Sequence, residues 1–341
     1  MKRPTMSDIA RAAGLSKGAV SYALNGRPGV SEPTRRRVLR IAEELGWVPN
    51  TAARALSADR AGAVGLAFAR PARILGLEPF FMQLISGIEA VLAERSLALV
   101  LQVVPDVDAE CEVYRRWWAA RRVDGVIMVD HRVSDPRLDV LAELGLPAVV
   151  AGGRPERAGI GSVWADDRVP MRSLVEFLAE LGHRSVARVA GLTELRHVTT
   201  RTAAFERVAA ERGMRVRVVD GDFSAEEGAR LTRELLRGRK RPTAIVFDND
   251  VMAVAGLAVA QELGVAVPTE LSIVSWEDSP LCRLVHPPLT ALARDIPAFG
   301  MTAARTLADI LDGGEPHAVQ AETLSLAVRG TTAPPQVTAK R

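Results

Sequence analysis

From residue 61 onwards, short apolar strands alternate with amphipathic helices, and this pattern restricts the fold more than any other feature of the chain. Strands separated by crossover helices pair in parallel, and a parallel sheet needs helices on both faces. The alternation therefore predicts doubly wound α/β units. The expected strands form two series, Val64–Phe68, Ala98–Val104, Gly125–Val129 and Ala148–Ala151, then Val186–Ala190, Arg215–Val219, Ala244–Phe247 and Leu271–Ser275. The helices expected between them are Phe80–Glu94, Glu110–Ala120, Pro136–Leu144, Arg168–Leu181, Arg201–Arg212, Ala225–Leu236 and Val251–Leu263.

Two series of strands within 341 residues predict two lobes, because a single hydrophobic core rarely extends beyond about 250–300 residues. Ligands of doubly wound sheets bind beyond the carboxyl ends of the strands. We therefore expect the binding site in the cleft between the two lobes.

Residues 5–25 precede this pattern and predict two short helices joined by a tight turn. Thr5 and Asp8 have the spacing of a capping box at the start of the first helix. Gly14 supplies the left-handed position that ends this helix, and Ser16 can cap the second. The outer face of the second helix suits base edges in a DNA major groove, and consists of Lys17, Gly18, Ser21, Tyr22 and Asn25. A generic pair of helices with a solvated face is the alternative interpretation.

The charge is divided unevenly along the chain. Residues 1–60 carry 11 Lys and Arg against 5 Asp and Glu, a net charge of +6, whereas the whole chain carries +3 and the remainder −3. A basic segment on a mildly acidic body indicates a polyanionic partner for that segment alone. A third expected helix, starting at Ser31 or Glu32, carries four arginines that suit DNA phosphates. These are Arg35, Arg36, Arg37 and Arg40.

The sequence also indicates where the protein works. Cys111 and Cys282 suggest neither a disulfide framework nor a metal cluster, which favours a reducing cytosol. We find no apolar core of a secretory signal and no run approaching the roughly 20 apolar residues of a membrane helix. The expected location is the cytoplasm.

Short motifs in the first 60 residues recur in register with one protein family. They resemble the headpiece and hinge helix of the lactose-repressor/galactose-repressor (LacI/GalR) family, and are Thr5–Asn25, Val30–Ser31, Thr34–Arg35, Trp47–Asn50 and Ala53–Leu56. Residues 61–328 resemble the periplasmic-binding-protein-like effector core of the same family. The resemblance implies an allosteric transcriptional regulator that binds DNA.

Together, the pattern and the resemblance predict four parts of the chain. These are a helix-turn-helix headpiece at 1–49, a hinge helix and linker at 50–60, a two-lobed effector-binding and dimerisation domain at 61–328, and a disordered tail at 329–341. Within the core we expect lobe 1 at about 61–161 and 292–320, and lobe 2 at about 162–291 and 321–328. The apolar heptad tail of tetrameric relatives is missing, so the expected assembly is a homodimer.

The resemblance implies which residues contact DNA. Lys17, Gly18 and Tyr22 occupy base-reading positions, and many relatives have an arginine in place of Tyr22. A phenol does not form the two hydrogen bonds that arginine makes to guanine, so this position reads the operator differently. Leu56 matches a leucine that the family inserts between base pairs in the minor groove. The remaining DNA-binding candidates are Thr5, Ser16, Ser21, Asn25, Val30, Ser31, Thr34, Asn50 and Ala53.

The resemblance also implies effector-binding residues in the cleft. Arg201, expected at a helix start, matches an effector-clamping arginine whose guanidinium can bind vicinal hydroxyls or a carboxylate. Asn249 matches another effector contact, and Glu277 falls where relatives have an aspartate. Aromatic faces beside charged groups suit a sugar, which presents apolar C–H faces and a rim of hydroxyls. The other candidates are Phe80, Phe81, His131, Trp164, His197, Phe223, Asp250 and Trp276.

We find no nucleotide-binding P-loop, no His-Glu-x-x-His zinc motif and no Gly-x-Ser-x-Gly nucleophile motif. No catalytic residue, metal or cofactor is therefore expected. The predicted function is a repressor of carbohydrate-utilisation genes that a sugar releases from a palindromic operator, with glucosides and short oligosaccharides as first candidates. A corepressor-dependent regulator that binds a purine or another non-sugar ligand is the alternative. A solute-binding protein or a sugar-modifying enzyme is more remote.

The predicted minor-groove leucine can be tested by truncation. The Leu56→Ala variant lacks the apolar wedge that compensates for unstacking a base step, so its operator affinity should fall by about tenfold or more. Effector affinity should stay unchanged. Titrating labelled operator DNA and, separately, the effector measures both quantities, and unchanged operator affinity would contradict the wedge role.

Overall fold

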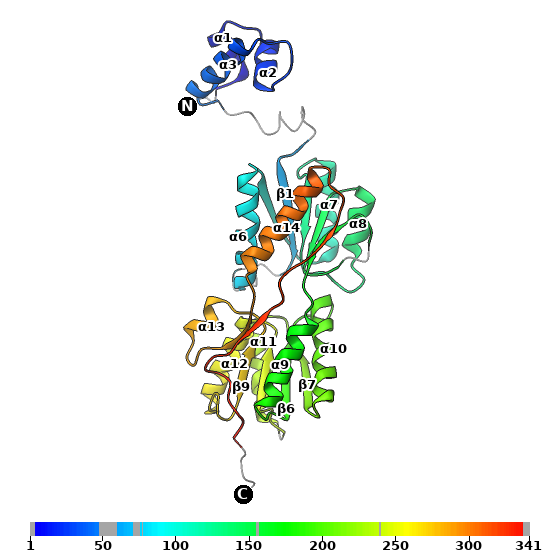
Figure 1. The fold of residues 1–341 in the computed structure, drawn as a ribbon, viewed down its shortest axis with the longest axis vertical. Coiled ribbons are helices and arrows are strands. Elements are labelled where there is room, and N and C mark those ends of the chain that lie inside the picture. The colour runs from blue at the N-terminus through cyan, green and yellow to red at the C-terminus, as the bar shows by residue number, and fades with distance from the viewer. Residues whose placement is uncertain are drawn as a thin grey trace. The chain divides into compact units, whose positions relative to one another are not determined.

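The chain divides into two compact units, Met1–Ala61 and Gly62–Arg341, which are described separately (Figure 1). The computed structural model describes residues 4–47, 60–70, 76, 78–154, 157–238 and 240–336. Most of the expected hinge segment, with the candidates Asn50, Ala53 and Leu56, lies outside the described residues, as do residues 337–341.

The described residues of the first unit form three helices, α1 (Met6–Ala13), α2 (Lys17–Leu24) and α3 (Glu32–Glu44). The Thr5 N–H donates to Asp8 Oδ2 at 2.9 Å, and Ser16 Oγ accepts from the Ala19 N–H at 3.1 Å. Gly14 has φ +65° and ends α1 in the left-handed conformation. The three predicted helix signals are confirmed. The helices enclose a small core of Ile9, Ala10, Ala13, Val20, Ala23, Val38, Ile41 and Ala42.

The second unit contains two six-stranded sheets. The first consists of β1 (Ala63–Ala69), β2 (Ala98–Val104), β3 (Gly125–Met128), β4 (Ala148–Ala151), β5 (Gly161–Trp164) and β11 (Ala318–Gln320). The second consists of β6 (Ser185–Ala190), β7 (Arg215–Asp220), β8 (Ala244–Phe247), β9 (Ser272–Ser275), β10 (Thr290–Ala293) and β12 (Ser325–Ala327). Their strand orders are β11-β5-β4-β3-β1-β2 and β12-β10-β9-β8-β6-β7. Adjacent strands are parallel except β10 and β12, which confirms the predicted doubly wound class.

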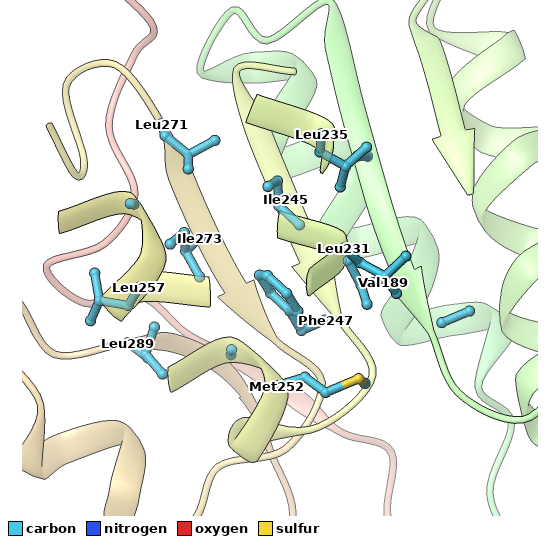
Figure 2. Packing of buried hydrophobic residues seen from close by; sticks show 14 of the residues in the cluster. Val189, Leu231, Leu235, Ile245, Phe247, Met252, Leu257, Leu271, Ile273 and Leu289 are labelled. Atoms are coloured by element: carbon cyan, nitrogen blue, oxygen red, sulfur yellow. The ribbon is translucent and has the colours of Figure 1, made fainter. Parts of the chain in front are cut away.

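Helices cover both faces of each sheet. Lobe 1 has α6 (Pro79–Glu94), α7 (Val107–Ala119), α8 (Pro136–Leu144) and α14 (Ile296–Leu311), and lobe 2 has α9 (Arg168–Glu180), α10 (Arg196–Glu211), α11 (Ala225–Arg237), α12 (Asp250–Glu262) and α13 (Pro280–Leu284). Side chains along β1 alternate, so Leu66 packs under α6 and α14 while Ala67 packs under α7 and α8. In lobe 2, Phe247 lies among Leu231, Met252 and Ile273 under α11 and α12 (Figure 2). None of the described helices is long and apolar enough to cross a bilayer.

Two expected lobe boundaries fall inside a strand instead of after it. β5 was expected largely in lobe 2 but belongs to the first sheet, and the last residues of β10 were expected in lobe 1 but belong to the second sheet. The chain therefore crosses between lobes at residues 165–167, 294–295 and 321–324. Each of these strands has only four residues, too few for hydrophobic periodicity to assign them to a sheet.

The expectation of a disordered tail is wrong for residues 329–336, which begin with Arg329 donating to Asp278 Oδ2 at 2.6 Å. Thr331 is fully buried, and its hydroxyl donates to Ile273 O at 2.7 Å and accepts from the Thr290 N–H at 2.8 Å. The Ala333 N–H donates to Ser272 Oγ at 3.2 Å. Composition suggested disorder because proline and small polar residues dominate the segment, but backbone pairing along lobe 2 fixes it.

Two glycines allow α6 and α14 to pack closely, although the helices lie more than 200 residues apart in the sequence (Figure 1). A Cβ on Gly300 would stand 2.3 Å from Leu84 O, and one on Gly87 would stand 2.0 Å from Pro297 O. These distances are shorter than any van der Waals contact and involve backbone atoms that cannot rotate away. The contact therefore requires glycine on both helices.

The Gly300→Ala variant should lose roughly 1–3 kcal/mol or more of its free energy of unfolding, because the added methyl group forces the helices apart. Ser86→Ala, at an exposed position of α6, is the matched control and should change stability by less than about 0.5 kcal/mol. Chemical denaturation followed by circular dichroism measures both, and equal stability of the two variants would refute this close packing.

Candidate functional site

The outer face of α2 is accessible as predicted. Lys17 and Gly18 are exposed, and Tyr22 is 45% exposed, whereas Val20 and Ala23 of the same helix are buried. The predicted base-reading side chains thus lie opposite the core of the first unit. A helix of this kind can enter a major groove without disturbing its own packing.

Several of the other predicted DNA-binding residues of the first unit are hydrogen-bonded to one another. Asn25 Nδ2 donates to Ser21 Oγ at 3.3 Å, and the hydroxyls of Ser31 and Thr34 lie 2.8 Å apart. Thr5 and Ser16 are exposed at the helix starts, and Val30 packs against the small core. On α3, Arg36, Arg37 and Arg40 are exposed, while Arg35 donates to Arg27 O at 3.0 Å. These groups form a polar, basic rim beside α2.

In the second unit, residues of both lobes line a cavity of about 70 Å³. Seven predicted effector residues lie on its wall, namely Phe80, Phe81, His131, His197, Arg201, Phe223 and Glu277. Five charged residues that were not predicted also line the cavity, namely Arg70, Glu78, Asp130, Asp167 and Arg294. The cavity is therefore more highly charged than predicted.

Arg70 lies at the centre of this arrangement. Its guanidinium donates to Asp130 through Nε at 2.7 Å and Nη2 at 3.0 Å, a bidentate pair. It also stacks on Phe223 of lobe 2 at 4.6 Å and on Phe81 at 5.6 Å. Burial opposes ionisation of Asp130, but the adjacent Arg70 outweighs it and lowers the pKa of that carboxyl. A charged guanidinium therefore occupies one face of the Phe223 ring.

Arg201 lies deep in the cavity wall. Its Nε donates to Asp167 Oδ2 at 2.8 Å, and its guanidinium stacks on Trp276 at 4.4 Å. The predicted position at a helix start is wrong, since α10 begins five residues earlier at Arg196. Trp276 is buried behind Arg201 and does not line the cavity. It packs against the side of the guanidinium that faces away from the cavity.

Two glutamates of the wall have pKa values displaced towards the neutral acid. Burial and the neighbouring Asp130 raise the pKa of Glu78 to about 7, although Arg70 opposes the shift. Burial raises the pKa of Glu277 well above its usual value, helped by the Asp250 and Glu78 carboxylates. Glu78 also links the lobes, because its Oε1 accepts from Asn249 Nδ2 at 3.2 Å.

Asn249 and Asp250 do not line the cavity, which differs from the prediction. Asn249 Oδ1 accepts from the Met252 N–H at 2.9 Å and caps α12, while its Nδ2 donates to Phe223 O at 2.9 Å. Asp250 is buried and affects the cavity through its charge on Glu277. Both residues hold the wall in place.

The charges of the cavity nearly balance within it. Three arginines face four acids, and two of the acids, Glu78 and Glu277, have raised pKa values. Arg70 and Arg201 each have a carboxylate within hydrogen-bond distance, and Arg294 is attracted by Asp167 and Glu277. Such a site offers many hydrogen-bond donors and acceptors, among them the buried Arg294 Nε, which has no hydrogen-bond partner among the described residues, and this suits a polar ligand.

Four of the five residues that were not predicted lie within three positions of the end of a strand. Arg70 follows β1, Asp130 follows β3, Asp167 follows β5 and Arg294 follows β10. The carboxyl ends of parallel strands form the ligand-binding edge of such sheets. Arg70 and Asp130 follow strands that the sequence predicts, so this rule places both at the cleft, whereas β5 and β10 are not among the predicted strands and Asp167 and Arg294 had no such signal.

Trp164 lies outside the cavity, in a wider groove of about 410 Å³. This groove shares Gly152, Ala165, Asp167 and His197 with the cavity, so the two spaces are neighbours. Within the part of the chain that the structure describes, no group of three His, Cys, Asp or Glu side chains is placed to hold a metal ion.

Both units of the chain match known proteins. Residues 5–50 match bacterial regulatory proteins of the lacI family, and residues 175–332 match a periplasmic binding protein-like domain. The HTH-type transcriptional regulator CelR of Thermobifida fusca is 32% identical over 318 residues, which cover 92% of this chain and 93% of that protein.

Two solved structures are similar over nearly the whole chain. The complex of the transcriptional regulator CelR with cellobiose is 30% identical, has a TM-score of 0.73, and is matched over 96% of this chain and 100% of that one. The lac repressor dimer bound to operator and the anti-inducer ONPF is 25% identical, has a TM-score of 0.85, and is matched over 97% and 100%.

The raised pKa of Glu78 predicts a pH dependence of stability. The folded protein holds a proton on Glu78 up to about pH 7, whereas the unfolded chain releases it near pH 4.5, so stability falls as pH rises through this window. Glu78→Gln keeps an oxygen acceptor for Asn249 and removes the titration. The variant should be about 1–3 kcal/mol more stable than the parent at pH 8 and equal to it at pH 4.

Denaturation curves collected from pH 4 to pH 8 measure this difference. Glu94→Gln, at the exposed C-terminal end of α6, which Glu78 directly precedes, is the control and should follow the parent at every pH. Parallel pH profiles of Glu78→Gln and the parent would rule out this assignment.

Proposed function

Because the chain belongs to the LacI family of bacterial regulatory proteins, we propose that it is a DNA-binding transcriptional repressor whose operator affinity falls when an uncharged sugar binds between the lobes. The family's members are regulators and not enzymes. The regulator would act as a homodimer on a palindromic operator in the cytoplasm, where bacterial DNA lies.

The balanced charge of the cavity is the observation that carries the choice of ligand. Arg70 and Arg201 are both paired with carboxylates, so two of the three cavity arginines need no anionic partner, and a hydroxyl oxygen can accept from the buried Nε of Arg294. Hydroxyl groups can donate to Asp130 and Asp167 and accept from the two arginines, while aromatic rings such as Phe223 pack against C–H faces. A neutral sugar uses all of these groups without leaving a charge unpaired.

The exposed face of α2 supports the DNA-binding half of the proposal. Lys17, Gly18 and Tyr22 are free of the core, and three arginines of α3 provide positive charge for phosphates. We propose that Lys17 and Tyr22 contact base edges and that the polar rim positions α2 on the backbone. Residues 50–60, with Asn50, Ala53 and Leu56, would complete the contact in the minor groove.

Sugar binding would act on DNA through the lobes. A ligand that contacts both lobes favours one arrangement of the lobes over another. Lobe 1 directly follows residues 50–60 in the sequence, so a change in the lobe arrangement would act on that segment. We propose that the sugar weakens operator binding, as an inducer does. A corepressor would have the opposite effect on operator affinity, so the same measurement separates the two.

The Arg201→Ala variant should bind operator DNA like the parent but no longer respond to the effector. Truncation removes a buried donor of the cavity and leaves Asp167 without its partner, so effector affinity should fall at least about tenfold. Arg207→Ala, on the exposed side of the same helix, is the control and should respond normally.

Fluorescence anisotropy with operator DNA from the protein's own promoter measures the response. A panel of neutral sugars, sugar phosphates and purines is titrated into each complex. Release of parent and control by neutral sugars alone supports the proposal. Tighter operator binding with any compound would indicate a corepressor, and normal release of Arg201→Ala would remove Arg201 from the site.

A further inference from the structure

Arg70 of lobe 1 reaches across the gap between the lobes and contacts an aromatic ring of lobe 2. Its guanidinium lies 4.6 Å from the centre of the Phe223 ring and 5.6 Å from that of Phe81, so one cation contacts an aromatic ring of each lobe. The Arg70 side chain is only 4% exposed, and a cation–π contact is strongest when water is excluded from it. Arg70 therefore links the lobes through groups that belong to the chain itself.

Lobe 1 fixes the direction in which Arg70 points. Asp130 accepts from Arg70 Nε at 2.7 Å and from Nη2 at 3.0 Å, and a bidentate pair of this kind leaves the guanidinium little freedom to rotate. Glu78 lies 3.8 Å from Arg70 Nη1 and accepts from Asn249 Nδ2 of lobe 2 at 3.2 Å. The cation–π contact and this hydrogen bond therefore cross the gap next to each other.

Lobe 2 fixes the ring that receives the cation. Phe223 has φ +70°, in the left-handed region that an aromatic residue rarely adopts, so its backbone is strained. A Cβ on Gly191 would stand 1.9 Å from the Phe223 ring, so a side chain at position 191 would displace the ring. Asn249 Nδ2 also donates to Phe223 O at 2.9 Å. Backbone strain persists only where the surrounding structure maintains it, and it is concentrated at ligand clamps and switch regions.

A ligand cannot stack on the face of Phe223 that Arg70 covers. The cavity that Arg70 lines measures about 70 Å³, well below the roughly 300–1,000 Å³ of most small-molecule sites. An effector of sugar size therefore needs the guanidinium to leave the ring and the lobes to separate. Separation would free the ring for C–H faces and the Asp130 carboxylate for hydroxyl groups.

We propose that Arg70 and Phe223 form a latch that holds the lobes together before an effector binds, and that the effector enters by displacing Arg70 from the ring. Displacement rests on the proposed function, because it assumes that the effector binds in the cavity that Arg70 lines. The latch itself involves only the chain. Lobe opening then precedes binding, so a firmer latch lowers the effector's apparent affinity and slows its association.

Two backbone amides report whether the lobes are together. The Arg196 N–H donates to His131 O at 2.9 Å and the Val133 N–H donates to Glu194 O at 3.0 Å, each across the gap between the lobes. Hydrogen exchange of these two amides in the full chain, without added ligand, therefore follows lobe opening. Phe223→Leu removes the aromatic face and keeps an apolar side chain, so both amides should exchange about fivefold or more faster than in the parent.

Phe177→Leu is the matched control, because it makes the same change at a half-buried position of α9 in lobe 2 that does not line the cavity. The two amides should exchange in it at the parent's rate. The double variant Arg70→Met/Asp130→Asn removes the cation together with its partner, which leaves no buried charge unpaired by the change, and it should accelerate the same amides. Slow exchange of the β1 and β8 amides establishes that each variant is folded.

Unchanged exchange of the two amides in a folded Phe223→Leu, or equal acceleration in Phe177→Leu, would refute the latch. Stopped-flow mixing with glucose, cellobiose and maltose tests displacement. A sugar that binds should associate with Phe223→Leu about fivefold or more faster than with the parent and Phe177→Leu, because the lobes open more often. Equal association rates would refute displacement and leave a sugar-responsive repressor intact. If no sugar binds or releases the operator, displacement fails with the proposed function, while the exchange rates still decide the latch.

Discussion

Apart from β12, the strands of each lobe run parallel, and most of the residues that define the cleft follow directly from where those strands end. A parallel sheet brings the carboxyl ends of its strands to one edge, where backbone and side chains are no longer committed to the core. Arg70, Asp130 and Asp167 lie at that edge of lobe 1, and Glu277 and Arg294 lie at that edge of lobe 2. The site is therefore a consequence of strand direction, and its chemistry depends on which residues occupy these few positions.

Placing so many charges in a narrow cleft requires that each be compensated, because removing an ion from water costs several kcal/mol. Further buried ion pairs lie behind the residues that line the cavity. Arg137 is buried against Glu110 and Asp135, and it donates to Asp130 O at 2.8 Å, which holds a backbone with φ +53°. In lobe 2, Asp248 binds Arg188 at 2.7 Å and fixes the turn that precedes Asn249. Buried ion pairs outside the cavity thus position the charged groups that line it.

The architecture could be predicted well from the sequence because most helices and strands show a clear pattern of apolar residues. The eight expected strands and most helices were found within a few residues, since apolar alternation is a local property. Most of β5 and the last two residues of β10 were assigned to the wrong lobe because each strand has only four residues, too few for hydrophobic periodicity to assign it to a sheet. Arg201 was recognised from its family register, whereas Arg70 and Asp130 belong to no motif. Their pairing joins residues 60 positions apart, which only the fold brings together.

The interface between the lobes explains how a small ligand can control their arrangement. The lobes are linked by the hydrogen bond from the Arg196 N–H to His131 O at 2.9 Å, by that from the Val133 N–H to Glu194 O at 3.0 Å, and by polar contacts of Glu78 and Arg70. Hydrogen bonds of this kind contribute about 0.5–1.5 kcal/mol each. An allosteric coupling of 1–3 kcal/mol, the typical range, is therefore comparable with the interactions that hold the cleft closed. In the proposed function, a sugar that bound Asp130 of lobe 1 and Arg201 of lobe 2 would add contacts of the same size across the same gap, and the difference in its affinity for the two lobe arrangements would shift the balance between them.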